Sequence, residues 1–97
     1  MFNLFRMVSI PQIYYKWFSY DAMDALTHLV SKGKTLMDNF DFEDALSCFE
    51  QALLLEPSNP ELWNLKGTAL RSIGRYQEAL ECFNKSLEID PRDKFAS

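Results

Sequence analysis

Few side chains in this chain are suited to catalysis or metal binding. His28 is the only histidine, so the sequence offers no cluster of histidine ligands and at most one nucleophile–histidine pair. Cys48 and Cys82 lie 34 positions apart and lack the C-x-x-C spacing of zinc and redox sites. Acidic pairs such as Glu43 and Asp44 fall where a helix should begin, and interaction with the helix dipole explains them. We therefore expect no enzyme, no cofactor and no metal site.

The elements that carry these residues come from an internal repeat. Residues 60–93 align with residues 26–59 without a gap, and nine of the 34 positions are identical. A fixed period of this length predicts a protein built from stacked repeats. The identical pairs are Lys32/Lys66, Gly33/Gly67, Leu36/Leu70, Ala45/Ala79, Leu46/Leu80, Cys48/Cys82, Phe49/Phe83, Leu53/Leu87 and Pro57/Pro91.

The period and its punctuation resemble the tetratricopeptide repeat family, whose signature is a W-x2-L-G-x2-Y helix followed by A-x3-F and Pro. The second copy matches this signature at Trp63, Gly67, Ala79, Phe83 and Pro91. The first copy matches it at Gly33, Ala45, Phe49 and Pro57. The resemblance implies an all-α fold of tandem antiparallel helix-turn-helix repeats, an α-solenoid, with an extra N-terminal helical segment. It also implies a module that binds another protein or a peptide, as a scaffold or adaptor does.

Four segments are expected along the chain. They are an aromatic N-terminal segment at 1–20, a first repeat at 21–59, a second repeat at 60–93 and a tail at 94–97. Within the repeats we expect helices at about 22–39, 42–55, 60–73 and 76–89. Ser19 or Asp21 is expected to cap the first helix and Asp41 the second. Asn59, followed by Pro60 in the first turn, is a compact start signal for the third.

Glycine positions predict how each helix pair packs and turns. Small residues on facing helices let two backbones approach closely, so we expect the paired contacts Gly33 with Ala45 and Gly67 with Ala79. Gly74 suits the left-handed backbone of a turn between helices. The first copy has Phe40 at that position, so its turn should either differ in shape or place Asn39 in the left-handed conformation.

Two surfaces of the expected fold have no partner within the repeats. After Pro11, apolar residues recur at helical spacing, and we expect them to cap the first repeat or to pair with another chain; they are Ile13, Tyr14, Trp17 and Phe18. The last helix exposes apolar residues that terminal repeats normally lack, namely Leu80, Phe83, Leu87 and Ile89. The alternatives to a binding module are therefore a self-associating homo-oligomer and a regulatory fragment of a longer repeat protein.

Composition excludes several other classes. A formal net charge of -4 and the absence of any basic run argue against nucleic acid as the partner. The apolar N-terminal segment is interrupted by Arg6, Pro11 and Lys16, so we expect no membrane span. Two cysteines at equivalent repeat positions favour buried free thiols over a disulfide framework, and hence a reducing, cytoplasmic setting.

A second stripe beside the packing line of each first helix is the candidate binding site. It consists of Val30, Lys34 and Met37 in the first repeat and Asn64, Thr68 and Arg71 in the second. Side by side, these stripes would form a concave face able to hold an extended or helical peptide; the alternative is an ordinary solvated helix face. Some members of the resembled family clamp acidic chaperone tails, but Val30, Lys34 and Leu65 stand where that clamp needs other residues. We expect no such clamp here.

Overall fold

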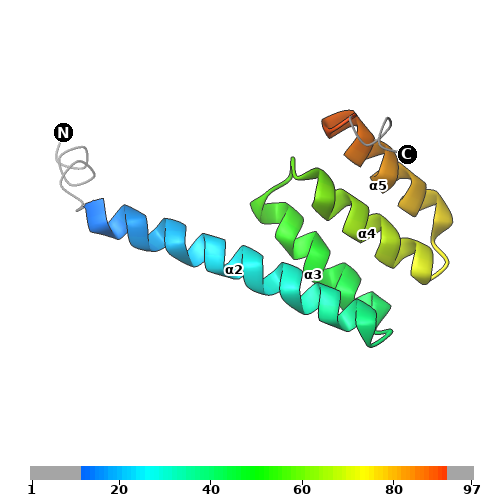
Figure 1. Cartoon of the computed structure of the whole chain (residues 1–97), viewed down its shortest axis with the longest axis horizontal. Coiled ribbons are helices and arrows are strands. Elements are labelled where there is room, and N and C mark those ends of the chain that lie inside the picture. The colour runs from blue at the N-terminus through cyan, green and yellow to red at the C-terminus, as the bar shows by residue number, and fades with distance from the viewer. Residues whose placement is uncertain (1–11, 92–97) are drawn as a thin grey trace, which may run out of the picture.

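The computed structural model describes the backbone of residues 12–91 and the side chains of residues 23–91. This part of the chain contains no strand and forms the helices α2 (Gln12–Asp38), α3 (Phe42–Leu55), α4 (Pro60–Ser72) and α5 (Tyr76–Ile89). Figure 1 shows α3, α4 and α5 lying side by side, with the C-terminal half of α2 alongside α3. The expected all-α repeat fold is confirmed, and the helices of both repeats fall close to their expected bounds except at the start of α2.

The first helix begins ten residues earlier than expected. It starts at Gln12 and runs without a break to Asp38, so Ser19 and Asp21 lie inside it, and the prediction that either one caps its start is wrong. No Gly or Pro occurs in residues 12–32 to end the helix, and Ser or Asp in a helix interior costs at most about 0.7 kcal/mol relative to Ala. A residue that could cap a helix is therefore not enough to prevent α2 from starting further upstream.

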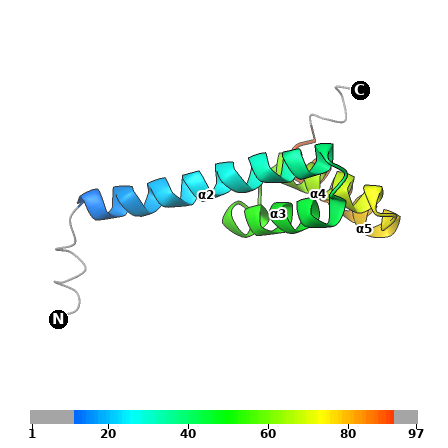
Figure 2. The same cartoon turned by 90° about the horizontal axis from the view of Figure 1, so that it is seen from below.

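The extra length makes α2 project from the rest of the fold. Its 27 residues span about 40 Å, against about 21 Å for the 14 residues of α3. Figures 1 and 2 both show its N-terminal half extending beyond α3, α4 and α5. The side chains expected to form a cap, Ile13, Tyr14, Trp17 and Phe18, lie outside those that the structure describes. Among the described helices, none is both long and apolar enough to cross a membrane.

Successive helices pack in pairs, α2 on α3, α3 on α4 and α4 on α5. The buried residues form two clusters. The first core cluster is Ala45, Leu46, Phe49, Ala69, Leu70, Ala79 and Cys82. The second core cluster is Ala52, Leu53 and Leu62. Because both clusters combine residues of α3 and α4, the contact between these two helices joins the two repeats into one core.

The nearest neighbour of the glycine in each repeat is an aromatic ring and not the expected alanine. A Cβ atom at Gly33 would lie 2.5 Å from Cε1 of Phe49, and one at Gly67 would lie 2.6 Å from Cε1 of Phe83. In each case the three nearest atoms all belong to that ring. Ala45 and Ala79, the partners predicted for Gly33 and Gly67, are therefore not the nearest ones. The glycines do let paired helices approach closely, but the space is filled by a phenylalanine.

The two turns within the repeats have the same shape despite their different sequences. Phe40 has a φ of 64° and Gly74 a φ of 87°. The amide of Asp41 donates to the carbonyl oxygen of Leu36 at 2.8 Å, as that of Arg75 does to Leu70 at 2.9 Å. Both expectations for the first turn are wrong, since its shape does not differ and the left-handed residue is Phe40, not Asn39.

The helix starts differ in how they are capped. Oδ1 of Asn59 accepts a hydrogen bond from the amide of Glu61 at 3.0 Å, which confirms the predicted start of α4. Asp41 does occupy the position before α3, but its side chain makes no capping hydrogen bond. The prediction that the Asp41 side chain caps α3 is thus wrong. The acidic first turn of α3, with Glu43 and Asp44, still faces the positive end of the helix dipole.

Polar contacts fix the loop that joins the repeats. Nε1 of Trp63 donates to the carbonyl oxygen of Pro57 at 2.8 Å, and Nδ2 of Asn59 donates to Glu56 at 2.9 Å. On the other side of α4, the buried hydroxyl of Ser86 donates to the carbonyl oxygen of Pro60 at 2.9 Å. The signature residue Trp63 therefore works as a hydrogen-bond donor that ties α4 to the end of α3.

Candidate functional site

A groove of about 290 Å³ opens between α2 and α4. Both helices contribute side chains, and both pack against α3. The lining residues are Leu26, Thr27, Val30, Ser31 and Lys34 from α2, with Asn59, Glu61 and Leu62 from the start of α4. The apolar members of this set come from side chains that also pack on the second core cluster. The groove is therefore an apolar floor with polar groups at its edge.

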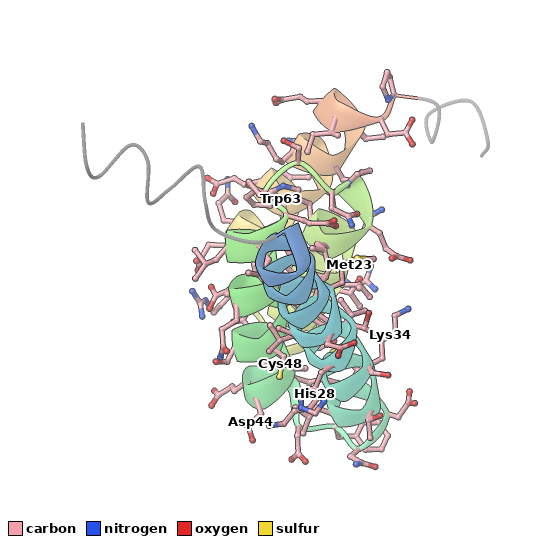
Figure 3. All side chains as sticks on the ribbon, turned by 90° about the vertical axis from the view of Figure 1, so that its left-hand side faces the viewer. Met23, His28, Lys34, Asp44, Cys48 and Trp63 are labelled. Carbon is pink, nitrogen blue, oxygen red and sulfur yellow. The ribbon has the colours of Figure 1, made fainter. Side chains whose placement is uncertain are left out.

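The predicted first stripe contributes two of its three residues to this groove. Val30 is half-buried and packs on the second core cluster, while Lys34 is exposed. Met37 is half-buried against the first core cluster and does not line the groove. Figure 3 shows Lys34 on the same side of α2 as Met23, which is 66% exposed. The stripe thus continues beyond the groove towards the projecting half of α2.

The predicted second stripe lies outside the groove. Asn64 and Thr68 are half-buried, and the Thr68 hydroxyl donates to the carbonyl oxygen of Asn64 at 2.9 Å. Arg71 is exposed, and its guanidinium carbon lies 5.8 Å from the centre of the Phe83 ring. This cation–π contact draws Arg71 towards α5. The structure therefore does not gather the six predicted residues into one hollow.

Charge at the groove is mixed. Lys34 and Glu61 are both exposed and both line it, and neither takes part in a salt bridge among the described residues. The side chain of Asn59 is already engaged, because it accepts from Glu61 and donates to Glu56. Lys34 and Glu61 are thus the charged groups of the groove that have capacity for an outside ligand.

Sequence reasoning missed six of the groove residues. They are Leu26, Thr27, Ser31, Asn59, Glu61 and Leu62. Thr27 and Glu61 could have been found from the sequence. Residues three apart share a helix face, and these two lie three residues before Val30 and Asn64. Asn59 and Leu62 carry no such signal, since one acts as a helix cap and the other belongs to the buried core.

One histidine and two cysteines are the side chains best suited to chemistry. His28 is exposed on α2. Cys48 and Cys82 are both buried and free. Burial raises the pKa of the Cys82 thiol above its ordinary value, which keeps it protonated and weakly nucleophilic. No group of three or more His, Cys, Asp or Glu residues in the described part of the chain is arranged to hold a metal ion.

Comparison with known proteins agrees with this geometry. The sequence model of a family described as tetratricopeptide repeat matches residues 30–94, which is about two thirds of the chain. No curated protein matches the sequence. The matched region begins at Val30, in the C-terminal half of α2, and covers α3, α4 and α5. It therefore includes both of the repeated Gly–Phe contacts. The chain therefore belongs to the tetratricopeptide repeat family.

Proposed function

We propose that this protein is an interaction module that holds a peptide or a helix of a partner protein against α2 and α4. Tetratricopeptide repeats generally mediate protein–protein interactions. The surface that we assign to this role, the α2–α4 face, is defined by the predicted residues together with the two found one step earlier. They are Thr27, Val30, Lys34, Met37, Glu61, Asn64, Thr68 and Arg71.

The observation that carries this proposal is the groove at Lys34 and Glu61. Its volume of about 290 Å³ is enough for a large apolar side chain, and Leu26, Val30 and Leu62 supply an apolar floor. Lys34 and Glu61 stand beside this floor as one donor and one acceptor group. An apolar anchor flanked by polar backbone or charged groups is the ligand that such a site fits best.

A charge reversal on α2 tests the proposal. Lys34→Glu should remove bound partner proteins from an affinity pull-down with the purified chain, because it places a second carboxylate beside Glu61 and expels an anionic group. Lys32→Glu is the matched control, since Lys32 is also exposed on α2 but does not line the groove. Partners that are lost with Lys34→Glu and kept with Lys32→Glu support the proposal. Equal retention by both variants and the wild type contradicts it.

We also propose that the chain works in a reducing compartment such as the cytoplasm. The support is that Cys48 and Cys82 are free and buried, so each serves as a small apolar core residue in its thiol form. Imaging of a tagged full-length protein checks this: diffuse cytoplasmic signal is expected, and accumulation in a secretory compartment contradicts it.

A further inference from the structure

The side of α5 that faces away from α4 has the same apolar residues as the side of α3 on which α4 packs. Leu46 and Leu80 are equivalent in the two repeats, yet Leu46 is 6% exposed and Leu80 is 54% exposed. Phe49 and Leu53 are likewise buried, whereas their equivalents Phe83 and Leu87 are only half-buried. In the first repeat, α4 provides part of this cover, because it shares both core clusters with α3. We call Leu80, Phe83 and Leu87 the α5 outer face.

The contact between α3 and α4 supplies a template for what fits there. Leu62 is 1% exposed and packs with Leu53 in the second core cluster. Next to it, Trp63 donates to the carbonyl oxygen of Pro57 at 2.8 Å. One turn later, Nζ of Lys66 lies 3.5 Å from Glu50 and 5.4 Å from the centre of the Trp63 ring. An apolar residue, an aromatic N–H donor and a cation thus form the contact set of α4.

The positions that would receive this contact set on α5 are open. A hollow of about 400 Å³ is lined by Asn84, Leu87, Glu88 and Pro91. These are the repeat equivalents of Glu50, Leu53, Leu54 and Pro57. Pro91 therefore presents the counterpart of the carbonyl group that Trp63 uses, and Leu87 the counterpart of the leucine that Leu62 covers. Two of the four lining positions, Leu87 and Pro91, thus carry the same residue as the first repeat.

Charge on this surface differs from the template at two positions. Asn84 replaces Glu50, and Glu88 replaces Leu54. Glu88 lines the hollow, so the carboxylate has moved by one turn of the helix. A helix that docks here should carry a cation placed to reach Glu88. The side chain that it places against Asn84 can be uncharged.

Among the described residues, α2 of a second copy of this chain does not supply such a helix. The helix that begins the repeats, α2, has polar residues where α4 has its buried contact residues. His28, Ser31 and Thr35 stand at the positions of Leu62, Leu65 and Ala69. All three are exposed, and the Thr35 hydroxyl already donates to the carbonyl oxygen of Ser31 at 3.1 Å. Head-to-tail stacking would bury the imidazole of His28 and the hydroxyl of Ser31, which costs free energy wherever no hydrogen-bond partner meets them.

We propose that the α5 outer face binds an amphipathic, basic helix of another protein, in the manner in which α4 packs on α3. The partner helix places a large apolar side chain on Leu80 and Leu87 and an aromatic N–H donor at the carbonyl group of Pro91. A cation on the same helix pairs with Glu88. Leu80 and Leu87 lie on a different helix from the α2–α4 face, and the two surfaces meet where the guanidinium carbon of Arg71 lies 5.8 Å from the centre of the Phe83 ring. The proposal goes beyond the function proposed above because it assigns a second partner site.

The chain contains its own probe for this interaction. A fluorescein-labelled peptide with the sequence of residues 59–73 carries Leu62, Trp63 and Lys66 and has one acidic and two basic residues. We expect saturable binding of this peptide to the full chain by fluorescence anisotropy. The variant Leu80→Glu should weaken it at least tenfold, because a carboxylate replaces the apolar centre of the face. A peptide with Ala in place of Trp63 should bind similarly poorly.

Two control variants separate this surface from the others. Leu54→Glu changes a leucine on α3 that is even more exposed, at 83%, and that does not belong to the α5 outer face. It should leave peptide binding unchanged, as should Lys32→Glu on α2, a residue that lines neither surface. No saturable binding, or equal weakening by Leu80→Glu and Leu54→Glu, overturns the proposal. A dimer in sedimentation velocity that Leu80→Glu dissociates also overturns it, because a second copy is then the occupant.

Discussion

Gly67 lies so close to Phe83 that a Cβ atom on the glycine would come within 2.6 Å of Cε1 of the ring. The same relationship joins Gly33 to Phe49, at 2.5 Å, in the first repeat. Ala is preferred to Gly in a helix interior by about 1 kcal/mol, so the sequence gives up helix propensity at both positions. Close packing of each phenylalanine against a bare backbone accounts for that choice.

Gly67→Ala should therefore destabilise the protein even though alanine is the better helix former. Overpacking of a well-filled core typically costs about 1–3 kcal/mol, which exceeds the gain of about 1 kcal/mol in propensity at all but the lowest end of that range. Urea unfolding followed by circular dichroism measures the change. In the double variant Gly67→Ala, Phe83→Leu the penalty should be smaller than the sum of the single effects, because the ring that meets the new methyl group is gone. Additive effects would show that the clash is not the cause.

The equivalent backbone positions Phe40 and Gly74 allow a second prediction. Both residues have positive φ values, and a left-handed conformation costs an L-residue with a side chain roughly 1–2 kcal/mol. No atom lies within 4 Å of a Cβ built on Gly74, so Gly74→Ala should destabilise through backbone strain alone. We expect a loss of about 1 kcal/mol in the free energy of unfolding, once the lower entropy of the unfolded Ala chain is included.

At Phe40 the same strain can be separated from a side-chain contact. Its ring lies edge-to-face with Phe42 at a centroid distance of 5.9 Å, although it is 78% exposed. Phe40→Ala and Phe40→Gly both remove this contact, but only Phe40→Gly relieves the strain. The glycine variant should be the more stable of the two by about 1 kcal/mol in urea unfolding. A difference near zero would mean that the turn relaxes to another conformation.

The extent to which the sequence predicts this structure varies from residue to residue. Asn59 and its neighbours predict the start of α4 correctly, because capping is a local interaction between adjacent residues. The left-handed conformation of Phe40 is not predicted, because a phenylalanine with a positive φ is rare. The backbone hydrogen bonds of the turn, and not the type of residue 40, impose this conformation. The partner of Gly33 depends on the rotation of α3 about its axis, which spacing alone does not determine.

The candidate site shows the same division. The sequence places Val30 and Lys34 on one stripe because a helical face has a fixed period, and in the structure both of them line the groove. It does not predict that Arg71 lies over Phe83, since that contact joins two helices and depends on how α4 and α5 pack. Residues on one helix face follow from the period, whereas their neighbours across helices follow from packing.

The last prediction concerns the thiol of Cys82. It is 5% exposed, and burial raises its pKa above the ordinary value for cysteine. At neutral pH the reactive thiolate is therefore rarer in the folded protein than in the unfolded chain, and access is restricted as well. In a Cys48→Ala variant, where Cys82 is the remaining cysteine, modification by a thiol-specific disulfide reagent should be slow. In guanidinium chloride it should accelerate by several orders of magnitude.

Raising the pH checks the physical cause. Because the folded-state pKa is raised, the contribution of this group to stability is fully present below the unfolded pKa and is lost as the pH rises through the folded value. Between pH 8 and pH 10 the Cys48→Ala variant should therefore lose more unfolding free energy than a variant that also carries Cys82→Ala. If the two variants lose stability equally, burial of the thiol has no influence on its ionisation. Fast modification of the folded variant at neutral pH would instead mean that α5 opens locally and exposes Cys82.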